Sequence, residues 1–163
     1  ARGTELDPEN GSMWGARAEA HGEKEQWQES LVAYMRAVTL ESEDDVLHNN
    51  LGNTYQMLGL PGKALDHHLR ALQLNPIDPR TLVNMGNAYR MLGQFEQALA
   101  SYSRAVRSSP DYAGAWLSYA SALELTGARE KAVEAYERAG QLDPSYRQYV
   151  AKRIKNLQEV RRD

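Results

Sequence analysis

The chain has 163 residues, of which 42% are hydrophobic and 25% charged, so it can bury the core of one domain or of a short helical array. A net charge of −3 argues against nucleic-acid binding through phosphate contacts, and the absence of cysteine excludes disulfides and thiolate metal sites. No run of 18 apolar residues occurs, so we expect no membrane insertion. The compartment is not fixed by these features, and a soluble, cytoplasmic protein is favoured.

Prolines recur at a fixed interval along the chain. Pro76, Pro110 and Pro144 are 34 residues apart, Pro8 lies two such steps before Pro76, and Ser42 stands in the slot between them. A period of this length is typical of stacked helical repeats. Counting back from the prolines predicts four units, at residues 11–44, 45–78, 79–112 and 113–146.

Residues 1–10 precede the first unit and can be read in two ways. Residues 5–8 resemble the end of a preceding repeat, whereas residues 11–13 read Gly-Ser-Met, like a cloning scar followed by an initiator methionine. Because Pro8 falls in phase with the later prolines, we favour the tail of a preceding repeat. On that interpretation the chain is a fragment of a longer protein.

The first unit, 11–44, departs from the pattern of the others. Arg17 and His21 stand where the second unit has Leu51 and Tyr55, and Glu25 stands where the later units have a turn glycine. Polar residues at positions that pack elsewhere weaken the apolar face of a helix. We therefore expect this unit to be the least regular, with a first helix that frays.

The later units repeat small residues at matching positions, which predicts pairs of closely packed helices. The small residues are Gly52, Gly86 and Ala120 in the first helices and Ala64, Ala98 and Ala132 in the second helices. The glycines predicted to turn the chain between paired helices are Gly59, Gly93 and Gly127. The predicted helices span about residues 12–24, 28–41, 45–58, 62–75, 79–92, 96–109, 113–126 and 130–143.

Residues 147–163 predict a further helix. Val150, Ile154 and Leu157 recur at helical spacing and would cover the exposed face of the fourth unit. The segment has six Lys/Arg against two Asp/Glu, a net charge of +4, whereas residues 1–146 have a net charge of −7. Its predicted basic face consists of Arg147, Lys152, Arg153, Lys155, Arg161 and Arg162. A polar outer face is what a terminal cap of a repeat array requires.

Over residues 11–146 this pattern of Leu-Gly, Tyr, Ala, a large residue, Ala and Pro resembles the tetratricopeptide repeat family. The resemblance implies an all-α, right-handed superhelical solenoid of four helix-turn-helix repeats, with 147–163 as its capping helix. It also implies a non-catalytic scaffold for protein–protein interaction that binds an extended peptide or partner segment in a concave groove lined by the first helices.

The same resemblance places the peptide-binding groove on selected positions of the first helices. An asparagine amide both donates and accepts hydrogen bonds, so a row of asparagines can pair with a peptide backbone. Such a row resembles the asparagine ladder in the repeat domain of O-linked N-acetylglucosamine transferases. The expected groove residues are Asn49, Asn50, Asn53, Met57, Arg80, Asn84, Asn87, Arg90, Met91, Leu117 and Ser121, with Val46, Val83, Glu124 and Leu125 beside them. Asparagines at these slots could instead serve only helix packing or turns.

A related version of this fold holds a chaperone's C-terminal tail with a clamp of Lys, Asn, Asn, Lys and Arg. On the second to fourth units Asn53 and Asn84 match that clamp, but Asn49, Gly114 and Ser118 replace its cations. Too few cations remain to fix a terminal carboxylate, so we expect no chaperone-tail clamp.

Candidate catalytic and metal-binding residues are few. His67 and His68 are neighbours and do not form the i, i+4 pair that zinc prefers, while His48 and His68 occupy slots of packing residues. The acidic cluster Glu41, Glu43, Asp44 and Asp45 is expected to be a solvated loop that favours the following helix N-terminus. We assign no catalytic residue, metal or cofactor.

Three functions stay open on these grounds. The first is the peptide-binding scaffold. The second is the substrate-recognition arm of a larger enzyme, such as a glycosyltransferase, whose catalytic domain lies outside these residues. The third is a self-assembling repeat scaffold, a homo-oligomer that buries apolar surface of the end repeats.

Overall fold

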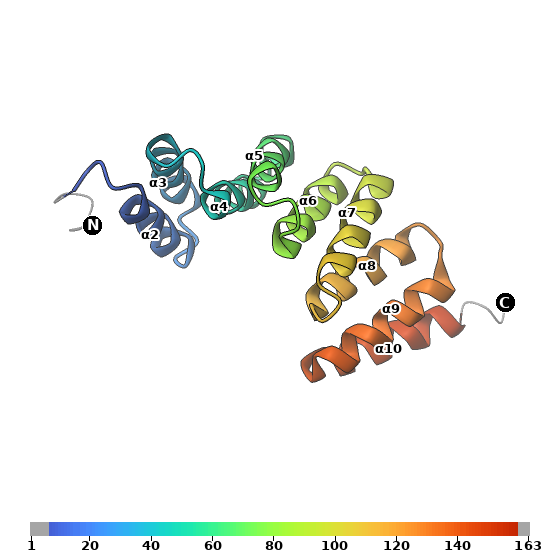
Figure 1. The fold of residues 1–163 in the computed structure, drawn as a ribbon. Helices are drawn as coiled ribbons and strands as arrows, with labels where there is room; N and C mark the ends of the chain where they lie inside the picture. The colour runs from blue at the N-terminus through green and yellow to red at the C-terminus, as the bar shows by residue number, and fades with distance from the viewer. Residues whose placement is uncertain (1–6, 160–163) are drawn as a thin grey trace. The chain divides into compact units, whose positions relative to one another are not determined.

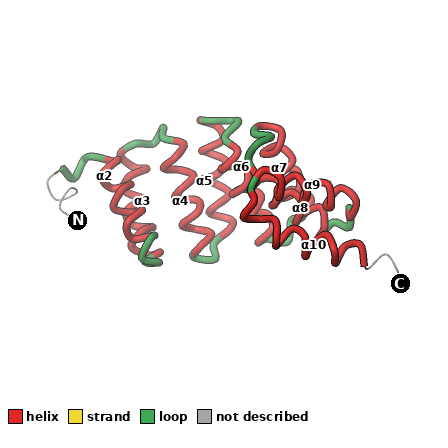
Figure 2. Tube along the Cα trace, turned by 90° about the horizontal axis from the view of Figure 1, so that it is seen from below, coloured by secondary structure: helices red, strands yellow, loops and turns green. Residues whose placement is uncertain are grey.

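The computed structural model of the chain describes residues 7–159, and within them every segment is helix or loop (Figure 2). The chain divides into two compact units, Ala1–Pro76 and Ile77–Asp163, which are taken one at a time below. The all-α prediction is confirmed.

The first unit consists of two helical hairpins, and the second helix of the first hairpin packs on the first helix of the next (Figure 1). Its helices are α2 (Gly11–Gly22), α3 (Trp27–Leu40), α4 (Asp45–Met57) and α5 (Pro61–Leu74).

The second unit repeats this arrangement and adds a last helix that packs on α9. Its elements are α6 (Pro79–Met91), α7 (Phe95–Ser108), α8 (Ala113–Leu125), α9 (Arg129–Leu142), the short 3₁₀ helix η1 (Pro144–Tyr146) and α10 (Arg147–Glu159).

Side-chain caps start most of the first helices of the hairpins. Asn10, Asp44 and Asp78 each accept a hydrogen bond from the backbone N–H three residues ahead, at 3.0, 2.8 and 2.8 Å. Such caps satisfy N–H groups that have no partner inside the helix. The start of α8 differs, because Tyr112 occupies its cap position and makes no such bond.

The turns inside the hairpins require a left-handed backbone. Gly59, Gly93 and Gly127 have φ of 72°, 73° and 79°, as the sequence predicts, and Glu25 adopts φ 56° at the equivalent position of the first hairpin. The expectation of a frayed first helix is wrong: α2 is formed from Gly11 to Gly22. Glu25 takes the conformation that glycine takes elsewhere, at a cost in backbone strain.

Close helix approach depends on the glycines of α4 and α6. A Cβ added to Gly52 would lie 2.6 Å from Cε1 of His68, and one added to Gly86 would lie 2.5 Å from Cε1 of Tyr102. Both large side chains are fully buried. The absence of a side chain at these glycines therefore lets α5 pack on α4 and α7 on α6.

The helix α10 covers the end of the second unit as the sequence predicts. Val150 is buried in a cluster with Tyr136 and Leu123, and Ile154 and Leu157 pack against the same cluster. Arg153 forms a salt bridge with Glu124 of α8, and its Nε donates to the Oε2 atom at 3.2 Å. Of the predicted basic face, Arg161 and Arg162 lie outside the described residues. Between residues 7 and 159, the helices are too short or too polar to cross a membrane.

Candidate functional site

A pocket of ≈ 480 Å³ opens between α2 and α4, which are the first helices of the two hairpins in the first unit. Asn50, Asn53 and Met57 of α4 form one wall, and Glu19 of α2 and Glu23, which follows α2, form the other. Side chains of the second helix α3 form the floor, which includes Trp27, Ser30 and Tyr34. Three of the predicted groove residues are thus brought together here.

The charge of this pocket is negative. Glu19 and Glu23 are its ionisable side chains besides Tyr34, and no Lys or Arg of the described chain lines it. Burial, together with the nearby charge of Glu19, raises the pKa of Tyr34 to about 12, although a hydrogen bond with Asn50 opposes the rise. Asn50 also donates weakly to Glu19, with 3.5 Å between Nδ2 and Oε1. The amide of Asn50 therefore already bonds within the protein.

A pocket of ≈ 270 Å³ lies between the first helices of the second unit. Asn87 and Arg90 of α6 face Leu117 and Ser121 of α8, so four more predicted groove residues share one site. The remaining wall residues are Tyr102, Ser118 and Tyr149. Arg90 is the charged side chain of this pocket.

The two pockets are built from equivalent positions. Equivalent positions in the two units differ by 68, or two repeat lengths, in residue number. Five residues of the first pocket have an equivalent that lines the second: Glu19, Gly22, Tyr34, Asn50 and Asn53. Their equivalents, in the same order, are Asn87, Arg90, Tyr102, Ser118 and Ser121. The shared architecture therefore carries a negative lining in one unit and a positive lining in the other.

The rest of the predicted groove residues lie apart from these pockets. Arg80 lines a different hollow of ≈ 300 Å³ with Asp111 and Tyr112. Asn49 and Asn84 are half-buried on α4 and α6, and Met91 is exposed at the end of α6. Two of the additional residues are engaged within the protein. Val83 is 7% exposed, and the carboxylate of Glu124 is occupied by Arg153 and by the Tyr136 hydroxyl.

Several wall residues were not predicted. Glu19 is equivalent to Asn53 and Asn87, so the 34-residue alignment could have identified it. Trp27 and Tyr34 belong to a second helix, which the expected groove did not include. Tyr149 belongs to α10, outside the repeat register, and no sequence signal pointed to it.

The second hairpin contains a cluster of histidines. His48 and His68 are buried, so their predicted packing role is confirmed. The ring of His67 stacks on those of His48 and Tyr55, with centroids 5.4 and 5.5 Å away. The Nε2 atom of His48 lies 3.1 Å from the carbonyl oxygen of Ser42, which can only accept. Nδ1 of His48 therefore accepts from Nδ1 of His67, which lies 3.1 Å away.

His68 stands where three other hairpins have Tyr34, Tyr102 and Tyr136. Its Nε2 atom lies 2.7 Å from Nε2 of Gln56, and its Nδ1 atom is buried without a hydrogen-bond partner. Burial, together with neighbouring His67, lowers the pKa of His68 to about 4. The imidazole is therefore held neutral in the folded protein.

The acidic cluster between the first two hairpins serves the fold. Asp44 caps α4, which confirms its predicted place at a helix start. The other carboxylates bond with neighbouring hairpin residues: Glu41 with Ser12, Glu43 with Arg70 and Asp45 with Asn75. In the described part of the chain, no group of three or more His, Cys, Asp or Glu side chains could hold a metal ion.

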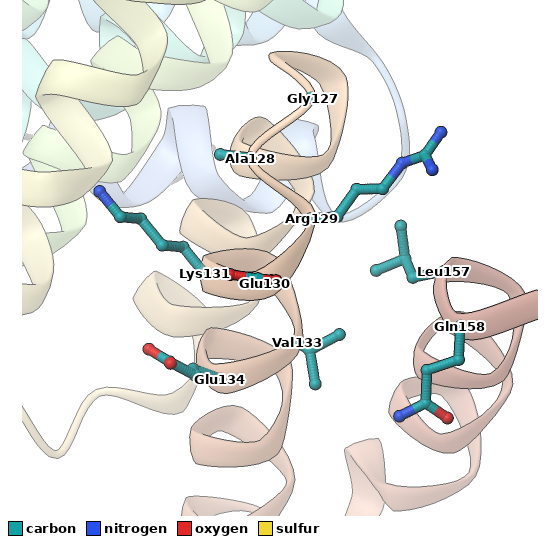
Figure 3. Close-up of a pocket in the computed structure, with 9 residues that line it drawn as sticks. All are labelled: Gly127, Ala128, Arg129, Glu130, Lys131, Val133, Glu134, Leu157 and Gln158. Atoms are coloured by element: carbon teal, nitrogen blue, oxygen red, sulfur yellow. The ribbon is translucent and has the colours of Figure 1, made fainter. Parts of the chain in front are cut away.

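A larger hollow of ≈ 760 Å³ lies between the start of α9 and the end of α10 (Figure 3). Val133 of α9 and Leu157 of α10 border it, and the charged side chains of Arg129, Lys131 and Glu134 surround it. None of the predicted groove residues lines it.

Comparison with solved structures shows the same fold. The structure of MamA matches with a TM-score of 0.79 at 20% identity, over 91% of this chain and 86% of that one. The structure of YrrB, described as a TPR protein with an unusual peptide-binding site, matches with a TM-score of 0.76 at 24% identity, over 94% and 78%. The first TPR of Spaghetti, bound to an HSP90 peptide, matches with a TM-score of 0.70 at 22% identity, over 75% and 96%.

Sequence comparison identifies the family. No curated protein matches the chain. Two family models, both described as tetratricopeptide repeat, match residues 45–111 and 83–147 and together cover more than half of the chain. With its helical hairpins and its recurring small residues, the chain belongs to the tetratricopeptide repeat family.

Proposed function

We propose that this chain is a non-catalytic scaffold for protein–protein interaction that binds an extended segment of a partner protein along its first helices. The observation that carries the proposal is the recurrence of one pocket, built from equivalent positions, in both units. A hollow that recurs at equivalent positions is what a segment docked on the first helices would occupy in each unit.

The chemistry of the walls fits a peptide. Asn53 contributes an amide and Ser121 a hydroxyl, groups that can bond to a peptide N–H or C=O. Met57 and Leu117 contribute apolar surface for side chains, and methionine adapts its shape to different partners. A mixture of backbone bonding and adaptable apolar contact favours a segment in extended conformation.

Two structures of the same fold support this reading. YrrB is described as having a peptide-binding site, and the Spaghetti repeat is described as bound to an HSP90 peptide. Peptide binding is thus a use to which this fold is put.

A displayed library of random peptides tests the proposal. We expect the wild-type chain to retain peptides. A variant with Asn53→Ala and Ser121→Ala should bind the selected peptides roughly thirtyfold more weakly, because two hydrogen bonds are lost at about 1 kcal/mol each. The control carries Gln97→Ala and Gln141→Ala, which remove exposed amides from the second helices α7 and α9. Unchanged affinity in the Asn53/Ser121 variant would remove the pockets from the binding surface.

Self-association is the second candidate, because the first hairpin exposes apolar surface beside a hollow that α2 and α3 form. Val32 is 66% exposed beside a hollow of ≈ 340 Å³ that Trp14, Arg17 and His21 also line. In the second hairpin the positions of Arg17 and His21 are held by the buried Leu51 and Tyr55. Light scattering over a concentration series would detect an oligomer, and Val32→Glu should abolish it.

A further inference from the structure

The pocket of the second unit has an uncompensated positive charge. Arg90 lines it, and no carboxylate of the described residues does. Glu124 occupies the position equivalent to Arg90 in the next repeat, but its carboxylate is paired with Arg153. The described ion pairs do not include Arg90.

This cation shares the pocket with the hydrogen-bonded pair Tyr102 and Asn87. The hydroxyl of Tyr102 donates to Oδ1 of Asn87 at 2.7 Å, so its oxygen can accept. Burial raises the pKa of Tyr102, and the nearby Arg90 opposes the rise. The cation therefore lies close to the Tyr102 floor of the pocket.

Further donors converge on the same hollow. Since Oδ1 of Asn87 accepts from Tyr102, the Asn87 side chain offers its two N–H donors to a guest. Ser121 and Tyr149, whose side chains carry hydroxyl groups, also line the pocket. A guanidinium together with neutral donors is a site for a carboxylate, because charge-assisted hydrogen bonds are the strong ones.

We propose that this pocket binds the carboxylate of an aspartate or glutamate side chain in the partner segment, with Arg90 as the cation and Tyr149 as part of the wall. The inference rests on the proposed scaffold function and specifies its guest. It also gives α10 a role beyond covering the last repeat. Tyr149 of α10 packs edge-on against Tyr136, with ring centroids 6.4 Å apart, and it also borders the pocket.

The equivalent pocket of the first unit provides an internal comparison. There Gly22 replaces Arg90 and Glu19 replaces Asn87. The architecture is shared and the charge is opposite, so the preference for an acidic side chain belongs to the second unit.

The test uses the full chain and a displayed library of random peptides. Wild type should select peptides with Asp or Glu at one fixed position, and Arg90→Glu should select Lys or Arg there. Arg104→Glu makes the same change of net charge at an exposed site on α7 and should select as wild type does. Circular dichroism checks that each variant is folded.

The affinities of one selected peptide for the variants then separate the contribution of Arg90 from that of Tyr149. Replacing its acidic residue by the matching amide should weaken binding to wild type at least tenfold and leave binding to Arg90→Gln nearly unchanged. Tyr149→Ala should weaken binding of the same peptide, whereas Gln148→Ala, at a neighbouring exposed position, should not.

The outcomes distinguish the two proposals. If wild type and Arg90→Glu select the same residue at that position, the carboxylate site is wrong and the scaffold function stands. If wild type retains no peptide above a blank surface, both proposals fail.

Discussion

The hydroxyl of Tyr102 donates a hydrogen bond to the amide oxygen of Asn87, 2.7 Å away. The bond joins a fully buried floor residue to a wall residue of the same pocket. It fixes which way the Asn87 amide faces, so the side chain that this bond orients is also one that we propose meets a ligand.

Removing this hydroxyl should destabilise the second unit. Tyr102→Phe leaves the amide oxygen of Asn87 without its donor, and we expect the free energy of unfolding to fall by about 1–2 kcal/mol in urea denaturation. The control Tyr119→Phe removes the hydroxyl of a half-buried ring that packs edge-on to Trp116. Equal losses in the two variants would contradict a specific role for the Tyr102–Asn87 bond.

The strained turn of the first hairpin offers a stabilising substitution. Glu25 has φ 56°, so Glu25→Gly should raise the free energy of unfolding by about 0.5–1 kcal/mol after the entropy cost of glycine is subtracted. Glu23→Gly is the matched control, because Glu23 has φ −59° and gains nothing from glycine. Thermal melting of the three proteins gives the comparison, and a lower melting temperature for Glu25→Gly would show that the turn is not strained.

Acid should weaken the second hairpin through His68. Its folded pKa of about 4 lies below the value of about 6.5 for an exposed imidazole, so the unfolded chain takes up the proton first as the pH falls. The contribution of this pKa difference to the free energy of unfolding is fully present above about pH 6.5. About 3 kcal/mol of it is lost as the pH falls from about 6.5 to 4. Burial also lowers the pKa of His67, which adds in the same direction.

The substitution His68→Tyr tests this pH dependence, because tyrosine occupies the equivalent position in the other hairpins. Urea denaturation at several pH values should show a smaller loss of stability in His68→Tyr than in wild type. Gln97→Ala, an exposed substitution outside the cluster, should keep the wild-type slope. Identical slopes in wild type and His68→Tyr would rule out His68 as the source.

The salt bridge between Arg153 and Glu124 should hold α10 on the last hairpin. Glu124 also accepts from the hydroxyl of Tyr136 at 2.9 Å, and these contacts hold the pKa of Arg153 above its usual range. A double-mutant cycle of Arg153→Met and Glu124→Gln should give a coupling of about 1 kcal/mol, because the pair is only partly buried. The coupling should shrink in high salt, and additive effects would show that α10 is held by Val150 and its apolar neighbours alone.

The sequence by itself determined the helical hairpins. The positions of Gly59, Gly93 and Gly127 in the 34-residue period place the turns, because a left-handed backbone is a local property of glycine. The apolar side of α10, with Val150 and Ile154, was equally readable because its helical spacing is local. The helix α2 was predicted at about residues 12–24 but was expected to fray. It is formed because Arg17 and His21 occupy half-buried sites, where polar side chains are tolerated.

Only the tertiary structure decided which groove candidates share a pocket. Asn53 and Asn87 line pockets whereas Asn49 and Arg80 lie elsewhere, because a pocket depends on side-chain direction and on the neighbouring helices. The pairing of Glu124 with Arg153 joins residues 29 apart on α8 and α10. Tyr149 lines the pocket because α10 packs on α9. The rotation and register of α10 decide this contact, and no local sequence pattern encodes them.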